Sequence, residues 1–476
     1  MPEFSQNDIQ QIQNHGLTLE IIQQQLADFK HGFPYSNIQS PATIGKGVLP
    51  MLDEQYAQIY DTNKDNYKIV KFVPASGAAT RMFKDLFEFL STGEMNKTTQ
   101  TVLDNLEQFA FYDDLKTLLP ANPTNHDIIE CLITERGLNY GNMPKALLKT
   151  HKYTDANRTA LAEHLIEGAQ YASAGGIVRI HFTVSPEHKS GFIDTLAQIV
   201  PEYEKKFTVK YDITMSTQKP ETDTIAVNLN NTPFRNEDGT LLFRPAGHGA
   251  LIENLNDINA DIIYIKNIDN VCPDDMRDST IFHKKSLAGM AIEMQQQIFK
   301  YMHALDNDTA NVDEIRTFIN DKLGIKITEN TDIRTILNRP LRVCGIIKNT
   351  GEPGGGPFWV GDTDGTIGLQ IVEPGQIAPE NIHILKNGEF FSPTDLVCMP
   401  YDYMGKKFNL IDFVDPSAGF ISEKSKNGHA LRAMERPGLW NGAMARWNTV
   451  FVETPLDTFT PIKVVTDLIK LTHKPK

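Results

Sequence analysis

Near the start of the chain, hydrophobic residues are spaced as on one face of a helix. They recur at Ile9, Ile12, Leu19, Ile22, Leu26 and Phe29. This period predicts two amphipathic helices, with Gly16 able to end the first and Thr18 able to cap the second. A stretch containing several Pro and Gly residues, 32–50, precedes another helical patch. We therefore predict a helical N-terminal subdomain over residues 1–62.

From residue 67 onward, short apolar runs alternate with amphipathic stretches. The runs expected to form strands are 67–73, 176–184, 206–215, 262–268, 341–347 and 368–372. The stretches expected to form helices are 82–90, 159–172, 189–200, 286–305 and 464–471. Strands that alternate with helices are typical of α/β proteins, so we predict a Rossmann-like sheet that is mixed but mostly parallel.

Composition adds an acidic balance to this picture. The 476 residues include 46 Lys plus Arg and 60 Asp plus Glu, a formal net charge of −14. Proteins that bind nucleic acids usually carry a basic surface, so this balance argues against a nucleic-acid partner. A small phosphate ligand is still compatible with it, because such a ligand needs only a local cluster of donors.

The sequence also argues against export and membrane insertion. Residues 1–10 lack the layout of a signal peptide, and no apolar stretch approaches the ~20 residues of a membrane span. The four cysteines are isolated, with no CxxC pair, at Cys131, Cys272, Cys344 and Cys398. That pattern fits a reducing compartment and no cysteine metal site, so we predict a cytoplasmic protein with no membrane partner.

The first candidate site is the loop after the strand expected at 67–73. It reads Ser76-Gly-Ala-Ala-Thr-Arg81 and leads into the helix expected at 82–90. A small-residue loop before a helix exposes backbone N–H groups to phosphate oxygens, and Arg81 can add a charged fork. An ordinary tight strand-to-helix connection is the alternative.

Two further motifs combine a polar side chain with residues that shape the backbone. Lys145 follows Pro144 and precedes an apolar run, and His248 lies between Gly247 and Gly249. Glycines beside a histidine allow close approach of a ligand that the imidazole can hydrogen-bond. A solvated lysine and an exposed loop histidine are the alternatives.

The last two candidates lie at the ends of expected elements. Asp269 follows the strand at 262–268, and Lys463 follows Pro461 at the entrance of the last expected helix. A carboxylate at the carboxyl end of a strand lies where ligands bind in open α/β folds, and it suits Mg²⁺. An Asx turn that closes the strand is the alternative. The sequence contains no P-loop, HExxH or GxSxG pattern.

Taken in order, these motifs resemble those of the sugar-phosphate nucleotidyltransferases, and most of all the UDP-sugar pyrophosphorylases. Residues 76–81 stand where that family has a GGxGTR-type loop, and Pro144-Lys145 stands where it has a PK-containing segment. Gly247-His248-Gly249 matches its GHG element. Asp269, followed by Asn270, matches its metal-binding aspartate at a strand end.

Two later motifs extend the resemblance, which covers residues 67–469. Leu369-Gln-Ile-Val-Glu373 matches an LQIVE-x-x-QI strand whose glutamate contacts sugar hydroxyls. Phe459-Thr-Pro-Ile-Lys463, followed by Asp467-Leu-Ile469, matches an FxPxK element that carries a catalytic lysine. The stretch 352–359 has no counterpart. The whole sequence also resembles an uncharacterised bacterial family, best represented in Bacteroidota, that is similar to a distant branch of this superfamily.

The resemblance implies a nucleotidyltransferase fold of the GT-A-like type. It places the core at 63–345, after the N-terminal subdomain, and a part that completes the sugar side at 346–476. The implied reaction is attack of a sugar 1-phosphate on the α-phosphorus of a nucleoside triphosphate, with UTP as the expected donor. The products are a nucleotide sugar and pyrophosphate, and the identity of the sugar stays open.

The resemblance also implies roles for individual residues. The catalytic residues are Arg81, Lys145 and Lys463. The nucleotide-binding residues are Ser76, Gly77, Ala78, Ala79, Thr80, Gly247 and His248. The sugar-binding residues are Gly249, Glu373 and Asn441, with Trp440 as a further candidate, whereas Trp447 is expected in the core. Asp269 is the implied ligand of Mg²⁺.

Two other functions stay open on the sequence alone. A glycosyltransferase on the same sheet would require a metal-binding acidic pair, and Asp269-Asn-Val lacks the second acid. A nucleotide-sugar-binding protein without catalysis is the other alternative, because the loop 76–81 carries fewer glycines than the family loop.

Overall fold

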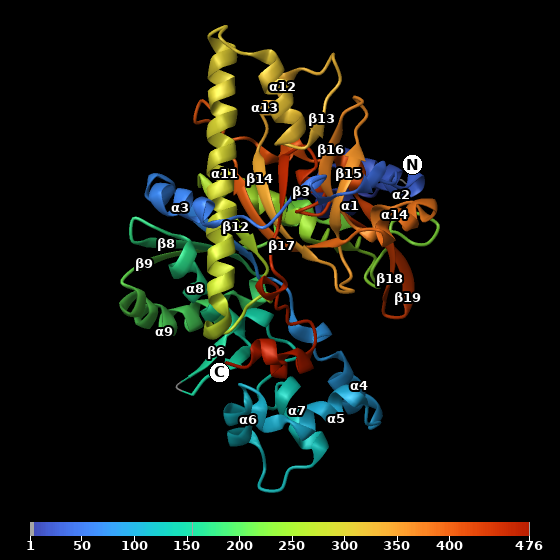
Figure 1. Cartoon of the computed structure of the whole chain (residues 1–476). Helices are drawn as coiled ribbons and strands as arrows, with labels where there is room; N and C mark the ends of the chain where they lie inside the picture. Colours follow the sequence, from blue (N-terminus) through green and yellow to red (C-terminus); the bar gives the residue numbers. More distant parts are fainter. Residues whose placement is uncertain (1–3, 155, 476) are drawn as a thin grey trace.

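A ten-stranded sheet forms the centre of the molecule in the computed structural model, which describes residues 4–154 and 156–475 (Figure 1). Its strand order is β2-β3-β20-β14-β17-β12-β4-β8-β7, and β9 also pairs with β8. The strands are β2 (Thr43–Ile44), β3 (Gly47–Leu49), β20 (Asn448–Glu453), β14 (Leu341–Lys348), β17 (Phe390–Met399), β12 (Ile262–Lys266), β4 (Ile69–Pro74), β8 (Ile177–Thr183), β7 (Ser173–Ala174) and β9 (Lys210–Ser216).

Most neighbouring strands of this sheet run parallel. The parallel pairs are β2–β3, β3–β20, β20–β14, β12–β4, β4–β8 and β8–β9. The antiparallel pairs are β14–β17, β12–β17 and β7–β8. The prediction of a mixed, mostly parallel α/β sheet is therefore confirmed.

Helices cover both faces of the sheet, which explains why its central strands are apolar throughout. One face packs against α3 (Glu54–Asn63), α11 (Arg277–Asp306), α12 (Val312–Asp321) and α13 (Ile333–Leu337), and the other packs near α10 (Leu251–Asn256). The long helix α11 runs along the sheet in Figure 1. Gly289 lets it approach α3 closely, because a Cβ there would lie 1.8 Å from the carbonyl oxygen of Tyr56.

A helical lobe is inserted between β4 and β8, at the bottom of Figure 1. It comprises α4 (Lys84–Thr92), α5 (Lys97–Asp104), α6 (Tyr112–Leu118) and α7 (Asn125–Ile133). The hairpin β5 (Lys149–Lys152) and β6 (Asn157–Thr159) leads from it to α8 (Ala160–Tyr171) and then β8. The C-terminal turns pack against this lobe, since Val465 and Leu468 belong to its hydrophobic core.

A second sheet of four strands, in the order β1-β15-β16-β13, lies beside the large one. Its strands are β1 (Ile38–Pro41), β15 (Gly356–Gly361), β16 (Ile367–Val372) and β13 (Ile325–Lys326). Two further pairs are β10 (Thr224–Ile225) with β11 (Phe243–Arg244), and β18 (Phe420–Lys426) with β19 (His429–Glu435). The short helix α14 (Ile382–Lys386) packs near β1.

The predicted helical N-terminal subdomain is not confirmed as a separate unit. Its helices α1 (Gln6–Asn14) and α2 (Leu19–His31) form as expected, and Thr18 caps α2 by accepting the N–H of Ile21. They pack on residues of β10 and β19, however, while β1 and β3 join the two sheets. Residues 1–62 therefore contribute to several layers of the molecule. The predicted boundary at 345–346 falls inside β14.

Three predicted helices have different extents in the structure. The helix α9 (Lys189–Phe207) includes Pro201 and extends past residue 200, so that β9 starts only at Lys210, and α11 begins at Arg277 rather than 286. The stretch 464–471 forms short 3-10 turns instead of a helix. The carboxylate of Asp467 accepts the N–H groups of Lys463 and Val464, at 2.7 and 2.8 Å, and closes a tight turn there.

The pattern did not predict two central strands, β17 and β20. The sequence of β17 contains Pro393, and a proline normally argues against a central strand because it has no N–H to donate. The structure accommodates it with an irregularity in the pairing of β14 and β17, where Thr394 has a φ of 61°. None of the helices in the described residues is long and apolar enough to cross a membrane.

Candidate functional site

The first candidate cluster lies where the parallel strands β4 and β12 end. Their register aligns Ile69 with Ile262, so both strands reach the same edge of the sheet. The N–H of Ile268 donates to the carbonyl of Pro74, at 3.3 Å, and keeps the segments that follow the two strands together. Asp269 follows directly, with its side chain 26% exposed at this edge.

Lys145 connects this edge with the C-terminal segment. Its Nζ donates to Oδ2 of Asp269 and to the carbonyl oxygen of Ile462, both at 2.8 Å. The lysine side chain is 19% exposed, so a partly dry environment strengthens the ion pair. Three motifs that are far apart in the sequence therefore meet at one amine.

Backbone pairing holds the C-terminal segment against the Asp269 turn. The N–H of Ile462 donates to the carbonyl of Asp269, and the N–H of Thr460 donates to Oδ1 of Asn270, both at 2.9 Å. Asn270 also forms a β-bridge with Pro461. These contacts place Lys463 next to the same edge of the sheet.

The loop 76–81 lies on the other side of Lys145. The N–H of Ala79 donates to the carbonyl of Met143, and the N–H of Lys145 donates to that of Gly77, at 2.9 and 3.3 Å. The N–H groups of Gly77 and Ala78 donate no hydrogen bond within the described residues, so they are available to an anion. The backbone geometry at position 77 does not demand glycine, since a Cβ there would meet nothing within 4 Å.

Arg81 ends a 3-10 turn, Ala79–Arg81, and α4 starts three residues later at Lys84. The arginine is exposed and forms no ion pair with any described residue. It is therefore a cation at the mouth of the loop rather than the first residue of the helix.

Lys463 has a partner that the sequence did not indicate. Its Nζ forms an ion pair with the carboxylate of Glu352, in the stretch without a family counterpart. Both side chains are substantially exposed, 43% for the lysine and 33% for the glutamate. The loop that carries Glu352 has Gly351 and Gly354 at φ values of 107° and 149°, where other residues are strained. The glycine content of this loop was the one feature of the sequence that could have drawn attention to Glu352.

The second candidate cluster is built around His248. Its ring stacks on the ring of Trp440, with centroids 4.2 Å apart and planes 12° from parallel. The N–H of Leu439 donates to Nδ1, at 3.0 Å, so the proton of the neutral ring lies on Nε2. Nε2 lies 3.6 Å from Oε1 of Glu373, at the end of β16.

Asn441 does not line this cluster but supports it indirectly. It is buried, and its Nδ2 donates to Oε1 of Gln376 at 2.9 Å. The same oxygen accepts the N–H of Glu373 at 3.0 Å, so Gln376 connects the two predicted sugar-side residues. The LQIVE-x-x-QI motif contains Gln376, but only the structure gives it this role. Trp447 is buried in the core, as expected.

The glycines around His248 serve the packing of the chain itself. A Cβ at Gly249 would lie 2.2 Å from the carbonyl oxygen of Pro437, so its own backbone fills the space predicted for a ligand. Gly247 has a φ of 73°, and a Cβ there would lie 2.5 Å from a carboxylate oxygen of Glu435. The GHG element therefore fixes His248 in place.

The glycine-rich loop joins the two clusters. A Cβ at Gly355 would lie 3.3 Å from Cγ of Glu373, and Glu352 of the same loop contacts Lys463. The N–H of Ser392 donates to the carbonyl of Gly355 at 2.9 Å, which anchors the loop to β17. Three of the predicted site residues, Ala79, Gly249 and Asn441, are buried, and the others are exposed or part-exposed.

The surroundings of the Asp269 carboxylate are compatible with a magnesium ion. Its Oδ2 accepts from Lys145, but its Oδ1 accepts no hydrogen bond from the described residues. Mg²⁺ is usually held by one or two carboxylates together with phosphates and waters, which matches a single part-exposed carboxylate.

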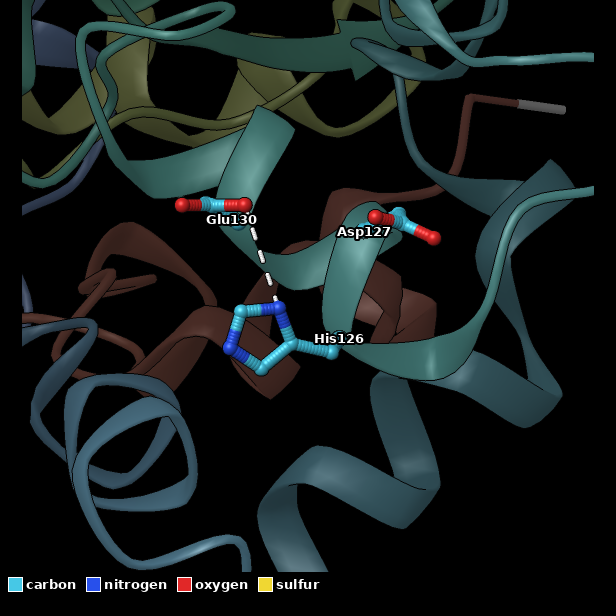
Figure 2. A group of neighbouring side chains, drawn as sticks. All are labelled: His126, Asp127 and Glu130. Carbon is cyan, nitrogen blue, oxygen red and sulfur yellow. Dashed lines mark ion pairs between the residues drawn. The ribbon is translucent and has the colours of Figure 1, made fainter.

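A different group of side chains, on the helical lobe, has the spacing of metal ligands (Figure 2). His126, Asp127 and Glu130 have ligand atoms within 4.8 Å of one another. The carboxylate of Asp127 caps α7 by accepting from Thr124, which lowers the pKa of that aspartate, and Glu130 pairs with Arg136 at 2.5 Å. These structural roles account for the group.

Comparisons with known proteins give one family match and distant structural matches. Residues 5–474 match the model of a family described as Domain of unknown function (DUF4301). No curated protein matches the chain.

Two of the structural matches bear the name UDP-N-acetylglucosamine pyrophosphorylase. One is a candidate UDP-N-acetylglucosamine pyrophosphorylase from Entamoeba histolytica, 13% identical, with 90% of this chain and 84% of that chain covered and a TM-score of 0.45. Another is a uridine diphosphate N-acetylglucosamine pyrophosphorylase from Trypanosoma brucei, determined with an inhibitor, 10% identical, with 94% and 74% covered and a TM-score of 0.49. Both scores are too low to assign an activity or a substrate.

Proposed function

Because the chain belongs to the DUF4301 family, whose description names no activity, we propose its function from the site itself. We propose that the protein is a nucleotidyltransferase that transfers a nucleoside monophosphate from a nucleoside triphosphate, UTP in the first instance, to a sugar 1-phosphate. A phosphate oxygen of the sugar 1-phosphate attacks the α-phosphorus, the bond from that phosphorus to the β-phosphate bridge breaks, and pyrophosphate leaves.

The observation that carries this proposal is the position of Lys145. Its Nζ lies 2.8 Å from both Oδ2 of Asp269 and the carbonyl oxygen of Ile462, and its N–H pairs with Gly77 of the loop. Phosphoryl transfer asks a protein mainly to position the reactants and neutralise their charge. Cations and free amides that converge at the carboxyl ends of parallel strands meet this requirement.

The residues of the first cluster would act on the phosphates. The N–H groups of Gly77 and Ala78 and the guanidinium of Arg81 would hold the triphosphate. Lys145 and Lys463 would neutralise charge on the leaving pyrophosphate and on the sugar phosphate. Mg²⁺ held by Asp269 would supply charge neutralisation between the phosphates of donor and acceptor when bound.

The residues of the second cluster would act on the acceptor. The Nε2–H of His248 would donate to an oxygen of the bound ligand, and Glu373 would accept from sugar hydroxyls. Trp440 and Asn441 would act indirectly, by holding His248 through stacking and Glu373 through Gln376.

A second candidate, a nucleotide-sugar-binding protein without catalysis, is favoured by one specific observation. Both lysines of the first cluster already have carboxylate partners, Asp269 and Glu352. A bound anion must compete with those partners, which weakens binding and lowers the effective positive charge of the site.

A pyrophosphate-exchange screen tests the proposal. Purified full-length protein with Mg²⁺ is incubated with radiolabelled pyrophosphate and a panel of UDP-, GDP-, ADP- and dTDP-sugars, and label in the triphosphate is measured. Exchange with one sugar nucleotide, abolished by Asp269→Ala, supports the transferase. Thermal stabilisation by a sugar nucleotide without exchange supports the binding protein, because a specific ligand stabilises by RT ln(1 + [L]/Kd).

A further inference from the structure

A small cavity near the end of the chain has a distinctive charge. Its volume is about 250 Å³, and its lining residues come from the helical lobe, from β5 and from the C-terminal turns. Its lining residues are Gln108, Ala110, Thr150, Lys152, Leu468, His473, Lys474 and Pro475. Among the described residues, none that lines it is acidic, although the protein carries a net charge of −14.

Two lysines supply the positive charge of the cavity. Nζ of Lys152 donates to the carbonyl of Glu107 at 2.7 Å, and Nζ of Lys474 donates to Oε1 of Gln108 at 2.5 Å. Neither amine forms an ion pair with a carboxylate of the described residues. These neutral partners orient the two ammonium groups without cancelling their charge, so the cavity favours an anion.

His473 is the third polar residue that lines the cavity, and a buried series of hydrogen bonds holds its ring in place. Nε2 of His151 lies 3.0 Å from Nδ1 of His473, and Nδ1 of His151 lies 2.8 Å from Oε1 of Glu163. Glu163 and His151 are fully buried, and His473 is only 2% exposed. The other oxygen of Glu163 accepts from Arg277 at 2.6 Å, which keeps the carboxylate an acceptor.

These hydrogen bonds decide whether Nε2 of His473 is a donor or an acceptor toward the cavity. Burial, with the neighbouring His151 adding to it, lowers the pKa of His473 to about 3, so the ring is neutral at pH 7. The carboxylate of Glu163 accepts from Nδ1 of His151, and Nε2 of His151 faces Nδ1 of His473 across one shared proton. Where that proton belongs to Nδ1 of His473, Nε2 of the same ring carries a lone pair, and this atom has no partner among the described residues.

We propose that the shared proton belongs to Nδ1 of His473 and that this cavity therefore binds an oxyanion that also carries an O–H donor: hydrogenphosphate, or a small phosphate ester with a free hydroxyl. The two lysines neutralise the oxyanion, and Nε2 of His473 accepts the O–H. A sulfate ion, which has no proton near neutral pH, would place an acceptor against that lone pair. The site therefore discriminates by the proton of the ligand as well as by its charge.

The site is separate from the proposed transferase site, and it lies on the segment that also carries Lys463. A ligand bound by His473 and Lys474 would tie this segment to Lys152 on β5 and hold the turn closed by Asp467. Occupancy would then stabilise the segment that presents Lys463. Binding itself does not depend on the transferase proposal.

Calorimetric titration of the full-length protein with inorganic phosphate, glycerol 3-phosphate and sulfate, at constant ionic strength in chloride buffer, tests the proposal. We expect phosphate, the ester or both to bind, and sulfate to bind at least about tenfold more weakly. The tighter of the two phosphate ligands identifies the source. Absence of binding by both, or sulfate binding as tightly as they do, would overturn the proposal.

Three variants locate the binding. Lys152→Met and Lys474→Met, which keep most of the apolar stem, should each weaken phosphate binding at least about tenfold. Lys116→Met is the matched control, because Lys116 and Lys152 both lie 5.8 Å from the ring centroid of Tyr112, but Lys116 does not line the cavity. Full binding in both cavity variants, or an equal loss in the control, would refute the assignment.

A fourth variant separates this cavity from the transferase site. Lys463→Met should leave phosphate affinity unchanged if the cavity is the binding site. Loss of binding in Lys463→Met, with retention in Lys152→Met, would place the phosphate at the first cluster and overturn the proposal. Circular dichroism and the melting temperature in chloride confirm that each variant is folded, which is expected because the substituted lysines are not buried.

Discussion

The two candidate catalytic lysines are held in contrasting ways. Lys145 is 19% exposed, and its amine contacts both a carboxylate and a backbone carbonyl of a paired segment. Lys463 is 43% exposed, and its only ion-pair partner in the described residues is Glu352, on a glycine-rich loop. The first lysine is therefore preorganised by the sheet edge, whereas the second can exchange its partner for a ligand at little cost. Within one site, the fold supplies both a fixed and an exchangeable cation.

The largest effect on activity should come from changing the carboxylate partner of Lys145, the fixed lysine. Asp269→Ala removes the partner of Lys145 and the proposed Mg²⁺ ligand, so pyrophosphate exchange should fall by on the order of 10²–10³-fold. Asp275→Ala, an exposed aspartate on the following turn, is the control and should leave the rate unchanged. Equal rates in Asp269→Ala and wild type would show that this edge of the sheet is not the reacting site.

The next effect concerns the backbone that carries the exchangeable lysine. Asp467→Asn weakens acceptance of the N–H groups of Lys463 and Val464, and it should lower the free energy of unfolding of the C-terminal segment by about 2 kcal/mol. Native-state hydrogen exchange of those amides measures it. Lys470→Met, which removes the ion pair between the exposed amine of Lys470 and the buried carboxylate of Asp467 but leaves both amide hydrogen bonds, should cost less, about 1 kcal/mol.

The pH dependence of this contribution follows from the same carboxylate. Burial opposes ionisation of Asp467, but hydrogen bonds from Lys470, Val464 and Lys463 outweigh it and hold the pKa of the carboxyl below its usual 3.8. The contribution is thus complete above pH 3.8 and is lost as the pH falls through the lowered folded-state pKa. The difference in amide protection between wild type and Asp467→Asn should shrink in that acidic range, and a difference independent of pH would contradict the assignment.

A smaller effect is expected at the second cluster. Glu373→Ala removes the acceptor opposite Nε2 of His248 and should raise KM for the sugar phosphate about tenfold, with little change in kcat. Glu380→Ala, an exposed glutamate on a nearby turn, is the control. An unchanged KM in Glu373→Ala would remove this cluster from the substrate site.

The smallest effect tests the exchangeable ion pair directly. Glu352→Gln removes the carboxylate that competes with substrate phosphates for Lys463, so KM should fall, by up to about fivefold for an exposed pair. Steady-state exchange kinetics measure this change in KM. Glu389→Gln is the control, because the exposed side chain of Glu389 forms no ion pair with described residues. The carbonyl of Glu389 accepts from Asn349, so the control lies beside the same loop. A rise in KM would instead make Glu352 a substrate-binding residue.

The pattern of the sequence predicted much of the large sheet, because its strands are buried on both faces and therefore appear as continuous apolar runs. It failed at β17, where Pro393 obscured a central strand that a local irregularity accommodates. It also predicted one helix over 464–471, because periodicity cannot register the carboxylate of Asp467 closing a turn on two amides.

For the candidate site, the residue types came from the sequence and their partners from the fold. The order of motifs singled out Lys145, Asp269 and Lys463, and each has the chemistry needed for phosphates. No pattern could indicate that Glu352 would pair with Lys463, or that the space beside Gly249 would be filled by Pro437, since these contacts join segments that meet only after folding. Local spacing thus determined the strands, the helices and the candidate chemistry of this chain. Tertiary packing alone decided which lysine is fixed and which is exchangeable, because burial and counter-ions depend on distant segments.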